Sequence, residues 1–336
     1  MKRIRIGEDN YFIKKSRNED RKLDVYNVLE NIIELPDVLI EIILEYMYYY
    51  EGKLVNEIRT TAKITYFCLS FDKKYIVCGY CDGGIRLLDI NTYEPKKYLY
   101  QRGGMICTII CLKNKIITGS IDSNIRIWDL ETNICENCFS NHYKSITCFA
   151  LNLEYLASAS LDGRINIWNL KDKKCCNSLT YHKVVVSSLL FLSDTQIISG
   201  SYDGILHMWD LENEKRNYII KAHTDRITHI LSLDRKRIVT SSFDKSLKVW
   251  INMNGILSLE HILLKHESHI NTFAILPNFD IISSGSDNIL IVWDISGNKT
   301  YYKTYHTSYE VDLISILPND QIITCGYLDQ ILRISK

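Results

Sequence analysis

Apolar and polar residues alternate in short runs along most of the chain after residue 50. Some runs are rich in β-branched or small residues, as in KIITGS (115–120) and YLASAS (155–160). Others alternate strictly, as in NIRIWDL (124–130) and SLKVW (246–250). A period of two residues, bounded by Gly, Asp and Asn, is typical of β-strands. Because no long helical period follows residue 50, the pattern predicts an all-β domain.

An Asp that follows each β-rich run marks an internal repeat. Seven such residues are spaced by 40, 40, 41, 41, 43 and 42 positions: Asp82, Asp122, Asp162, Asp203, Asp244, Asp287 and Asp329. Six residues after five of them stands a Trp: Trp128, Trp168, Trp209, Trp250 and Trp293. A His precedes five of them by 20 to 23 residues: His142, His182, His223, His266 and His306.

This pattern resembles the WD repeat, from about residue 53 to residue 336. The resemblance implies a seven-bladed β-propeller of four-stranded antiparallel sheets, here preceded by a short α-helical N-terminal segment. In that family the His, a Ser or Thr of the second strand, the turn Asp and the Trp form a hydrogen-bond relay inside a blade. Blades three to six carry the full set: His142, Ser158, Asp162, Trp168; His182, Ser199, Asp203, Trp209; His223, Thr240, Asp244, Trp250; His266, Ser283, Asp287, Trp293.

A Ser, a His and an Asp could also indicate a nucleophilic triad. Because the set recurs in four blades, we interpret it as structural. The other blades depart from the set. Blade two has Arg102 in the His position. Blade seven has Cys325 and Ser335 in the hydroxyl and Trp positions, and blade one has Thr60, Cys78 and Leu88 in the His, hydroxyl and Trp positions.

The two ends of the repeat region are complementary. Residues 51–60 resemble an outermost strand that has no blade of its own, and the last blade, ending in ILRISK (331–336), lacks an outermost strand. We therefore expect the propeller domain to span 51–336, with 51–60 closing the last blade. Closure would remove the free sheet edges that promote aggregation.

Residues 24–50 precede the ring and carry apolar residues at helical spacing. Within them LPDVLIEIILEYM (35–47) resembles the opening of an F-box, a family whose members dock on the linker subunit of a cullin-type ubiquitin ligase. The matching positions are Leu35, Pro36, Leu39, Ile43, Tyr46 and Met47. The resemblance implies a substrate-recruiting adaptor, although Val38 replaces the usual Glu and only the first F-box helix is present.

Two other interpretations of this segment remain open. The helix could pack on the propeller of a scaffold for another complex, with a purely structural role. Alternatively, LEYMYYYEGKL (44–54) resembles the closing helix of a BTB domain, another ubiquitin-ligase adaptor. Residues 1–23 are rich in charge, and we interpret them as a flexible tail.

In WD propellers the turn Asp residues and the loops that lead into the inner strands lie on one face. The residues before four of the turns would form an apolar arc there: Ile121, Leu161, Tyr202 and Phe243. Arg226 and His269 come from the neighbouring loops. Aromatic residues beside an Arg are typical of a peptide-binding hot spot, so we expect protein or peptide ligands. Packing on neighbouring blades is the alternative. Arg102 is the only other Arg placed near this face, whereas a phosphopeptide reader needs an Arg cluster.

Charge and motifs narrow the function further. Forty basic and forty acidic residues give zero formal charge, which argues against a nucleic-acid or anionic-membrane binder. No 18-residue apolar run or secretory signal is visible. No P-loop, HExxH or GxSxG motif occurs, so we expect no enzyme activity and no cofactor.

The eleven cysteines indicate a reducing compartment, either cytoplasm or nucleus. Two CxxC spacings, Cys78/Cys81 and Cys135/Cys138, make a zinc site conceivable. Because Cys78 lies at a strand position that other repeats fill with Ser or Thr, we predict no metal. We expect the protein to be an intracellular monomer.

Overall fold

The computed structural model describes residues 54–60, 62–213, 215–253, 256–295, 301–327 and 330–335. The predicted tail (1–23) and the predicted helical segment (24–50) lie outside the described residues. The six F-box-like positions therefore lie outside them too: Leu35, Pro36, Leu39, Ile43, Tyr46 and Met47. No helix that is both long and apolar enough to cross a membrane occurs in the described part of the chain.

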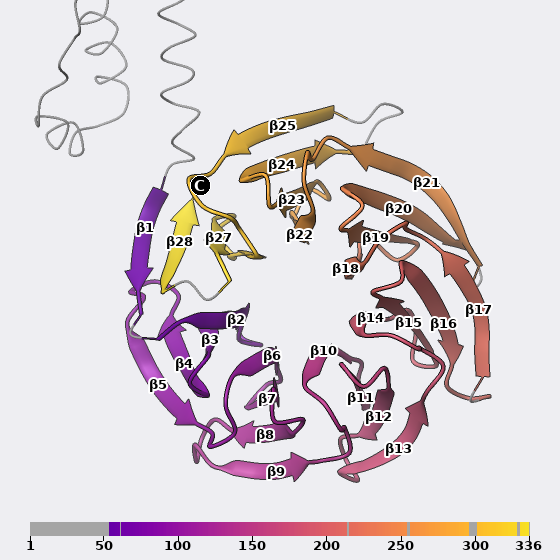
Figure 1. Ribbon diagram of the computed structural model, residues 1–336. Helices are drawn as coiled ribbons and strands as arrows, with labels where there is room; N and C mark the ends of the chain where they lie inside the picture. Colours follow the sequence, from indigo (N-terminus) through magenta and orange to yellow (C-terminus); the bar gives the residue numbers. More distant parts are fainter. Residues whose placement is uncertain are drawn as a thin grey trace, which may run out of the picture. The chain divides into compact units, whose positions relative to one another are not determined.

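The described residues form seven antiparallel sheets of four strands each, set around a central space (Figure 1). The inner strands are β2 (Ile64–Leu69), β6 (Ile106–Cys111), β10 (Ile146–Leu151), β14 (Val186–Phe191), β18 (Ile227–Ser232), β22 (Ile270–Ile275) and β26 (Leu313–Ile316). The second strands are β3 (Tyr75–Tyr80), β7 (Lys115–Ser120), β11 (Tyr155–Ser160), β15 (Gln196–Ser201), β19 (Arg237–Ser242), β23 (Ile281–Gly285) and β27 (Ile322–Cys325).

The third strands are β4 (Gly84–Asp89), β8 (Ile125–Asp129), β12 (Ile165–Asn169), β16 (Ile205–Asp210), β20 (Ser246–Met253), β24 (Ile289–Asp294) and β28 (Ile331–Ser335). The outer strands are β5 (Pro95–Tyr100), β9 (Cys135–Phe139), β13 (Lys174–Leu179), β17 (Lys215–Lys221), β21 (Ile256–Leu264), β25 (Tyr301–His306) and β1 (Leu54–Arg59). Numbered from β2, blades 1 to 6 each use four consecutive strands, and blade 7 combines β26, β27 and β28 with β1. The prediction of an all-β, seven-bladed propeller is confirmed.

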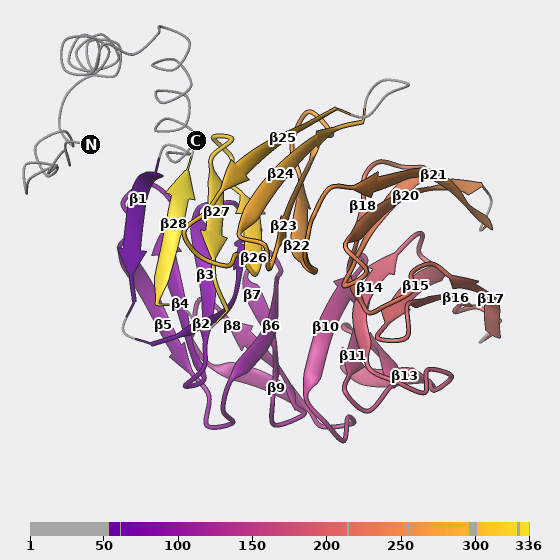
Figure 2. The ribbon, with the colours of Figure 1, turned by 45° about the horizontal axis from the view of Figure 1, so that its top comes forward.

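The hydrophobic core lies between neighbouring blades, whose sheets face one another around the ring (Figure 2). For example, Ile117 and Phe139 of blade 2 pack in one cluster with Ile146 and Trp168 of blade 3. The second strands are buried on both faces, and the outer strand β13 alternates between exposed and covered positions. These burial patterns explain why the second strands read as apolar or small runs.

Small residues in the second strands let adjacent blades approach closely. A Cβ atom added at Gly119 would lie 2.5 Å from the side chain of Ile146 on the next inner strand. One added at Gly200 would lie 2.8 Å from Ile227 in the same way. Glycine is therefore required at these positions by packing between blades rather than by a turn.

Blade 7 is completed by a strand that is distant in sequence. β1 pairs antiparallel with β28, with Glu57 opposite Arg333 and Arg59 opposite Ile331. Beyond the strand, the Thr60 N–H donates a hydrogen bond to the carbonyl of Gln330 at 2.8 Å. The core cluster at this junction joins residues of blades 1 and 7 and includes Ile58 of β1. The ring is thus closed by β-sheet pairing and by apolar packing.

Candidate functional site

One face of the propeller is formed by the turns that carry the Asp residues and by the inter-blade loops. In six blades the residue before the turn Asp donates its N–H to a carbonyl of the inter-blade loop, at 2.9 to 3.1 Å: Cys81 to Lys63, Ile121 to Met105, Leu161 to Ser145, Tyr202 to Val185, Phe243 to Arg226 and Ser286 to His269. These bonds hold each turn beside a loop. We call this surface the top face.

Blade 3 shows how the turn is tied to the interior. Nδ1 of His142 lies 3.1 Å from a carboxylate oxygen of Asp162, and Nε2 lies 2.8 Å from the Ser158 hydroxyl. The Trp168 indole N–H donates to the same hydroxyl at 2.8 Å. With Ser158 donating to Nε2, a neutral His142 can donate from Nδ1 to Asp162. Every polar group of the relay then has a partner, which a buried network requires.

The same four side chains meet in blades 5 and 6. In blade 5, His223 lies 2.9 Å from Asp244 and 2.7 Å from Thr240, and Trp250 donates to Thr240 at 3.0 Å. In blade 6, His266 lies 2.9 Å from Asp287 and 2.8 Å from Ser283, and Trp293 donates to Ser283 at 2.8 Å. The recurrence of one geometry in three blades fits a structural role for the relay.

Blade 4 differs at the Asp. His182 lies 2.7 Å from the Ser199 hydroxyl, and Trp209 donates to that hydroxyl at 2.8 Å. Asp203 is exposed and accepts hydrogen bonds within its own turn, from the Ser201 hydroxyl and the Ile205 N–H. His182 stacks on His207, with ring centroids 3.9 Å apart. This turn is therefore held by bonds of its own.

In blade 2 the interpretation of Arg102 as the residue in the His position is corrected. Gln101 is buried there, and its side-chain oxygen accepts from the Thr118 hydroxyl at 3.3 Å. Trp128 donates to Thr118 at 3.0 Å. Arg102 is exposed. The physical reason is that a neutral amide can be buried when it is hydrogen-bonded, here also by donating to the Gly104 carbonyl at 3.3 Å, whereas a guanidinium remains in solvent.

In blade 7 the hydroxyl position belongs to Thr324 and not to Cys325. Thr324 pairs with Arg333 across the hairpin, as Ser158 pairs with Asn166 in blade 3. The two residues are nine positions apart in blade 7 and eight in blade 3. Asp329 lies outside the described residues. The offset of the other blades, applied to Asp329, therefore placed the hydroxyl residue at Cys325, one position after Thr324. The Tyr309 hydroxyl lies 2.6 Å from the Thr324 hydroxyl and fills the place of the His.

Burial and hydrogen bonding shift the pKa values of the relay in opposite directions. Burial lowers the pKa of His223 and of His266 below the ordinary 6.5, and the neighbouring carboxylates only partly oppose this. Burial acts to raise the pKa of Asp162, but hydrogen bonds from His142 and the Tyr143 N–H outweigh it and lower the pKa to about 2. Elsewhere, burial lowers the pKa of His229 in β18 to about 4.

These shifts predict that the propeller loses stability in mild acid. Above the pKa of an unfolded histidine, about 6.5, these imidazoles are neutral in the folded and in the unfolded chain, and they do not reduce the free energy of unfolding. As the pH falls below that value, the unfolded chain binds protons that buried His223, His229 and His266 do not, so the free energy of unfolding decreases. Thermal unfolding measured between pH 7.5 and 5.5 should show a midpoint that declines below pH 6.5. An unchanged or rising midpoint would contradict this assignment.

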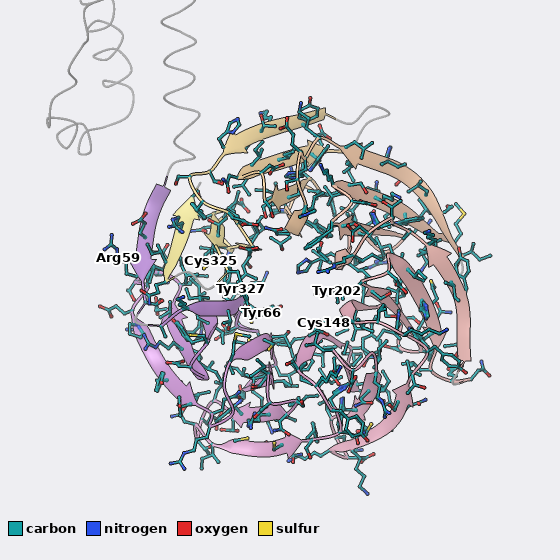
Figure 3. The ribbon with its side chains drawn as sticks, viewed as in Figure 1. Arg59, Tyr66, Cys148, Tyr202, Cys325 and Tyr327 are labelled. Atoms are coloured by element: carbon teal, nitrogen blue, oxygen red, sulfur yellow. The ribbon has the colours of Figure 1, made fainter. Side chains whose placement is uncertain are left out.

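The predicted apolar arc lies on the top face of blades 2 to 5. Ile121 is 49%, Leu161 39% and Tyr202 40% exposed, whereas Phe243 is half-buried. Tyr202 lies at the inner side of the ring, next to the central space (Figure 3). Three large apolar side chains therefore remain in solvent on adjacent blades.

Phe243 belongs to a group of stacked side chains that also includes the two predicted loop residues. The Arg226 guanidinium lies 4.8 Å from the ring centroid of Tyr202 and 5.5 Å from that of Phe243. The His269 ring stacks on Phe243 at 4.5 Å and 14°. We call Tyr202, Arg226, Phe243 and His269 the Arg226 stack.

Two further side-chain contacts lie on this face, of which the sequence indicated only the position of Tyr143 in an inter-blade loop. Arg164 lies over the ring of Tyr143, 4.8 Å from its centroid, so the expectation that Arg102 is the only other Arg near this face is corrected. Tyr327 of blade 7 is exposed, and its hydroxyl lies 3.7 Å from the sulfur of Met105 in blade 2. Figure 3 shows Tyr327 across the central space from Tyr202. The repeat placed Tyr143 in a loop but gave no signal for its contact with Arg164. It gave none for Tyr327, because Tyr327 belongs to the longer hairpin of blade 7.

The cysteine pairs form no metal site in the described part of the chain, where no three His, Cys, Asp or Glu side chains are grouped to hold an ion. Cys78 is buried in β3, whereas Cys81 lies in the turn that follows. Cys135 and Cys138 lie on the outer strand β9, where Cys138 is exposed.

A family model described as the WD domain, G-beta repeat, matches residues 133–169, 173–210, 214–250 and 257–294. Each match covers the outer strand of one blade and the first three strands of the next. The chain therefore contains WD40 repeats and folds as a seven-bladed propeller. No curated protein matches its sequence. WD40 propellers are in general non-enzymatic scaffolds that bind proteins or peptides.

Proposed function

We propose that this chain is a non-enzymatic interaction scaffold that binds a protein or peptide on its top face. The observation that carries the proposal is the exposed apolar arc of Ile121, Leu161 and Tyr202. Exposed apolar side chains that cluster on one surface are typical of interaction sites. Here they stand at equivalent turns of three adjacent blades.

The turns that carry these apolar side chains are held by hydrogen bonds, which favours the same function. Leu161 and Tyr202 each donate a backbone N–H to an inter-blade loop at 3.0 Å. The turn next to Leu161 is also tied to the core through Asp162 and His142. A ligand that docks on side chains held in this way orders few groups on binding, so less conformational entropy is lost.

A peptide-display selection tests the proposal. A random library is selected on the full chain, and recovered peptides are measured against a variant with Leu161→Ala and Tyr202→Ala. We expect that variant to lose at least about tenfold in affinity, because interface hot spots contribute more than about 1.4 kcal/mol. Leu153→Ala is the matched control, since Leu153 is 94% exposed in the loop between β10 and β11 at the opposite end of blade 3.

Equal binding to the double variant and to the wild type would place the peptides elsewhere and contradict the proposal. Failure to recover any peptide that needs Leu161 or Tyr202 would do the same. Thermal unfolding of both variants establishes that a loss of binding does not reflect a loss of fold.

A second candidate function is favoured by residues 35–47. We propose that this F-box-like stretch recruits the linker subunit of a cullin-type ubiquitin ligase, so that the propeller presents a substrate. Leu35, Pro36, Leu39, Ile43, Tyr46 and Met47 are the positions that support it. The alternative is that residues 24–50 serve only the stability of a scaffold for another assembly.

Substitutions within residues 35–47 distinguish the adaptor role from the purely structural role. Leu39→Asp with Ile43→Asp should abolish co-purification of the linker subunit and cullin while the propeller keeps its unfolding midpoint. Glu41→Gln, in the same stretch but off the matching positions, should retain both partners. If the wild-type chain folds but brings down neither subunit, the adaptor proposal fails. If the Asp variant is less stable than the wild type but still binds the same partners, the segment is structural.

A further inference from the structure

We infer that the Arg226 stack binds the carboxylate of an acidic side chain in the peptide ligand. The inference rests on the proposed function, because it assigns a chemistry to one part of the top face. Arg226 lies close to two aromatic rings, and exposed apolar side chains lie beside them on the same face.

The two rings fix the orientation of the guanidinium. Arg226 is exposed, and its Cζ atom lies 4.8 Å from the Tyr202 centroid and 5.5 Å from the Phe243 centroid. A cation over an aromatic face is attracted by the ring quadrupole. Contact with the rings uses none of the guanidinium N–H donors in a hydrogen bond, so these donors stay available to a ligand.

The Arg226 side chain forms no ion pair with any residue in the described part of the chain. Other arginines do: Arg126 lies 2.6 Å from Asp122, and Arg237 lies 2.7 Å from Asp234. The acidic neighbour of Arg226 in sequence is Asp225, whose carboxylate accepts the backbone N–H of Arg226 at 2.7 Å. The guanidinium N–H donors are therefore available to an anion of the ligand.

The stack is organised before a ligand arrives. Phe243 is held by the His269 ring at 4.5 Å, and Nδ1 of His269 lies 2.9 Å from the Phe243 carbonyl, to which it can donate. The Phe243 N–H in turn donates to the carbonyl of Arg226 at 2.9 Å. An arginine loses side-chain conformational entropy when a ligand orders it. Here much of that loss has already occurred on folding.

The number of cations favours a carboxylate over a phosphate. A phosphorylated residue carries close to two negative charges and is typically bound by an Arg cluster. The stack offers one guanidinium, and its two donors in a plane match the two oxygens of a carboxylate. We therefore assign an Asp or Glu of the ligand to this position.

The rest of the face indicates how the ligand lies. Leu161 and Ile121 continue the exposed surface from the stack toward blade 2, so large apolar residues should flank the acidic one. On the other side, Glu310 accepts a hydrogen bond from Asn271 at 2.8 Å and Asp312 accepts the Tyr327 N–H at 2.8 Å. Two carboxylates there disfavour a second acidic residue near blade 7.

The peptides recovered on the full chain provide the test. We expect Asp or Glu at one fixed position with a large apolar residue nearby. For a representative peptide, isothermal titration should show a loss on the order of tenfold to a hundredfold when Arg226→Ala is introduced, since hydrogen bonds to charged groups contribute about 1.5–3 kcal/mol. Replacing the acidic residue of the peptide by its amide should lower affinity similarly, and the two changes together should add little.

Arg235→Ala is the matched control, because Arg235 is an exposed arginine in the loop between β18 and β19, at the opposite end of blade 5, and should leave affinity unchanged. Arg226→Lys keeps the charge without the planar fork and should recover only part of the affinity. Peptides that need Leu161 and Tyr202 but show no acidic preference would overturn the inference and leave the proposed function standing. A gain above about a hundredfold on replacing the acidic residue by phosphoserine, or full binding to Arg226→Ala, would also overturn it.

Discussion

A chain shortened to begin at residue 60 is expected to lose the single cooperative unfolding transition of the propeller. The shortened chain lacks β1, whose register with β28 runs from Leu54 opposite Ser335 to Arg59 opposite Ile331. At about 1 kcal/mol for each net hydrogen bond, the lost pairing amounts to on the order of 5 kcal/mol. That is comparable with the total stability of many domains, about 5–15 kcal/mol. The loss also uncovers the buried side chains of Leu332 and Ile334.

Calorimetry and urea unfolding measure the effect. The matched control is a chain that begins at residue 53, because it keeps the whole of β1. The control should unfold in one transition, and the shorter chain should unfold in a broad transition or aggregate. Identical unfolding of the two chains would show that blade 7 does not depend on β1.

Replacing Thr240 by Val should be among the most destabilising changes of a single hydroxyl in this protein. Thr240 is fully buried, and its oxygen joins Nε2 of His223 at 2.7 Å to the Trp250 N–H at 3.0 Å. Valine fills the space but leaves both groups buried without that partner. Each such group costs about 1–3 kcal/mol, so we expect a total loss of about 2–6 kcal/mol.

Thr240→Ser provides the control, because in blades 3, 4 and 6 the hydroxyl that accepts the Trp N–H belongs to a serine: Ser158, Ser199 and Ser283. It should retain most of the stability that Thr240→Val loses. Urea unfolding followed by tryptophan fluorescence reports the difference. Equal stabilities of the Val and Ser variants would mean that the relay hydroxyl contributes packing and little hydrogen bonding.

The repeat period made the propeller predictable from sequence. A turn Asp, a Trp six residues later and a His upstream are local signals, and blades 3, 5 and 6 place these side chains at hydrogen-bonding distance. Strand type follows as well, since burial of the second strand on both faces requires small or apolar runs such as KIITGS. These features depend on residues that are close in sequence.

The relay residues that differ from the prediction depend on local geometry, which the spacing of the repeat does not specify. Gln101 replaces the His because a neutral amide one position earlier reaches Thr118, and Thr324 replaces Cys325 because the hairpin is one residue longer. Both errors came from counting at fixed offsets. The Arg226 stack joins residues of adjacent blades, so its residues could be assigned to one face but their stacking order could not be predicted.

The pairing of β1 with β28 has a consequence for biosynthesis. Arg59 and Ile331 lie 272 positions apart, so β1 leaves the ribosome long before its partner exists. At about 5–20 residues per second, the interval is roughly 14 to 54 seconds. Throughout that time the nascent polypeptide carries an open β-edge at its early end and a second edge that moves forward with each completed blade. Chaperone capture of the nascent chain should therefore persist until translation reaches the final strand.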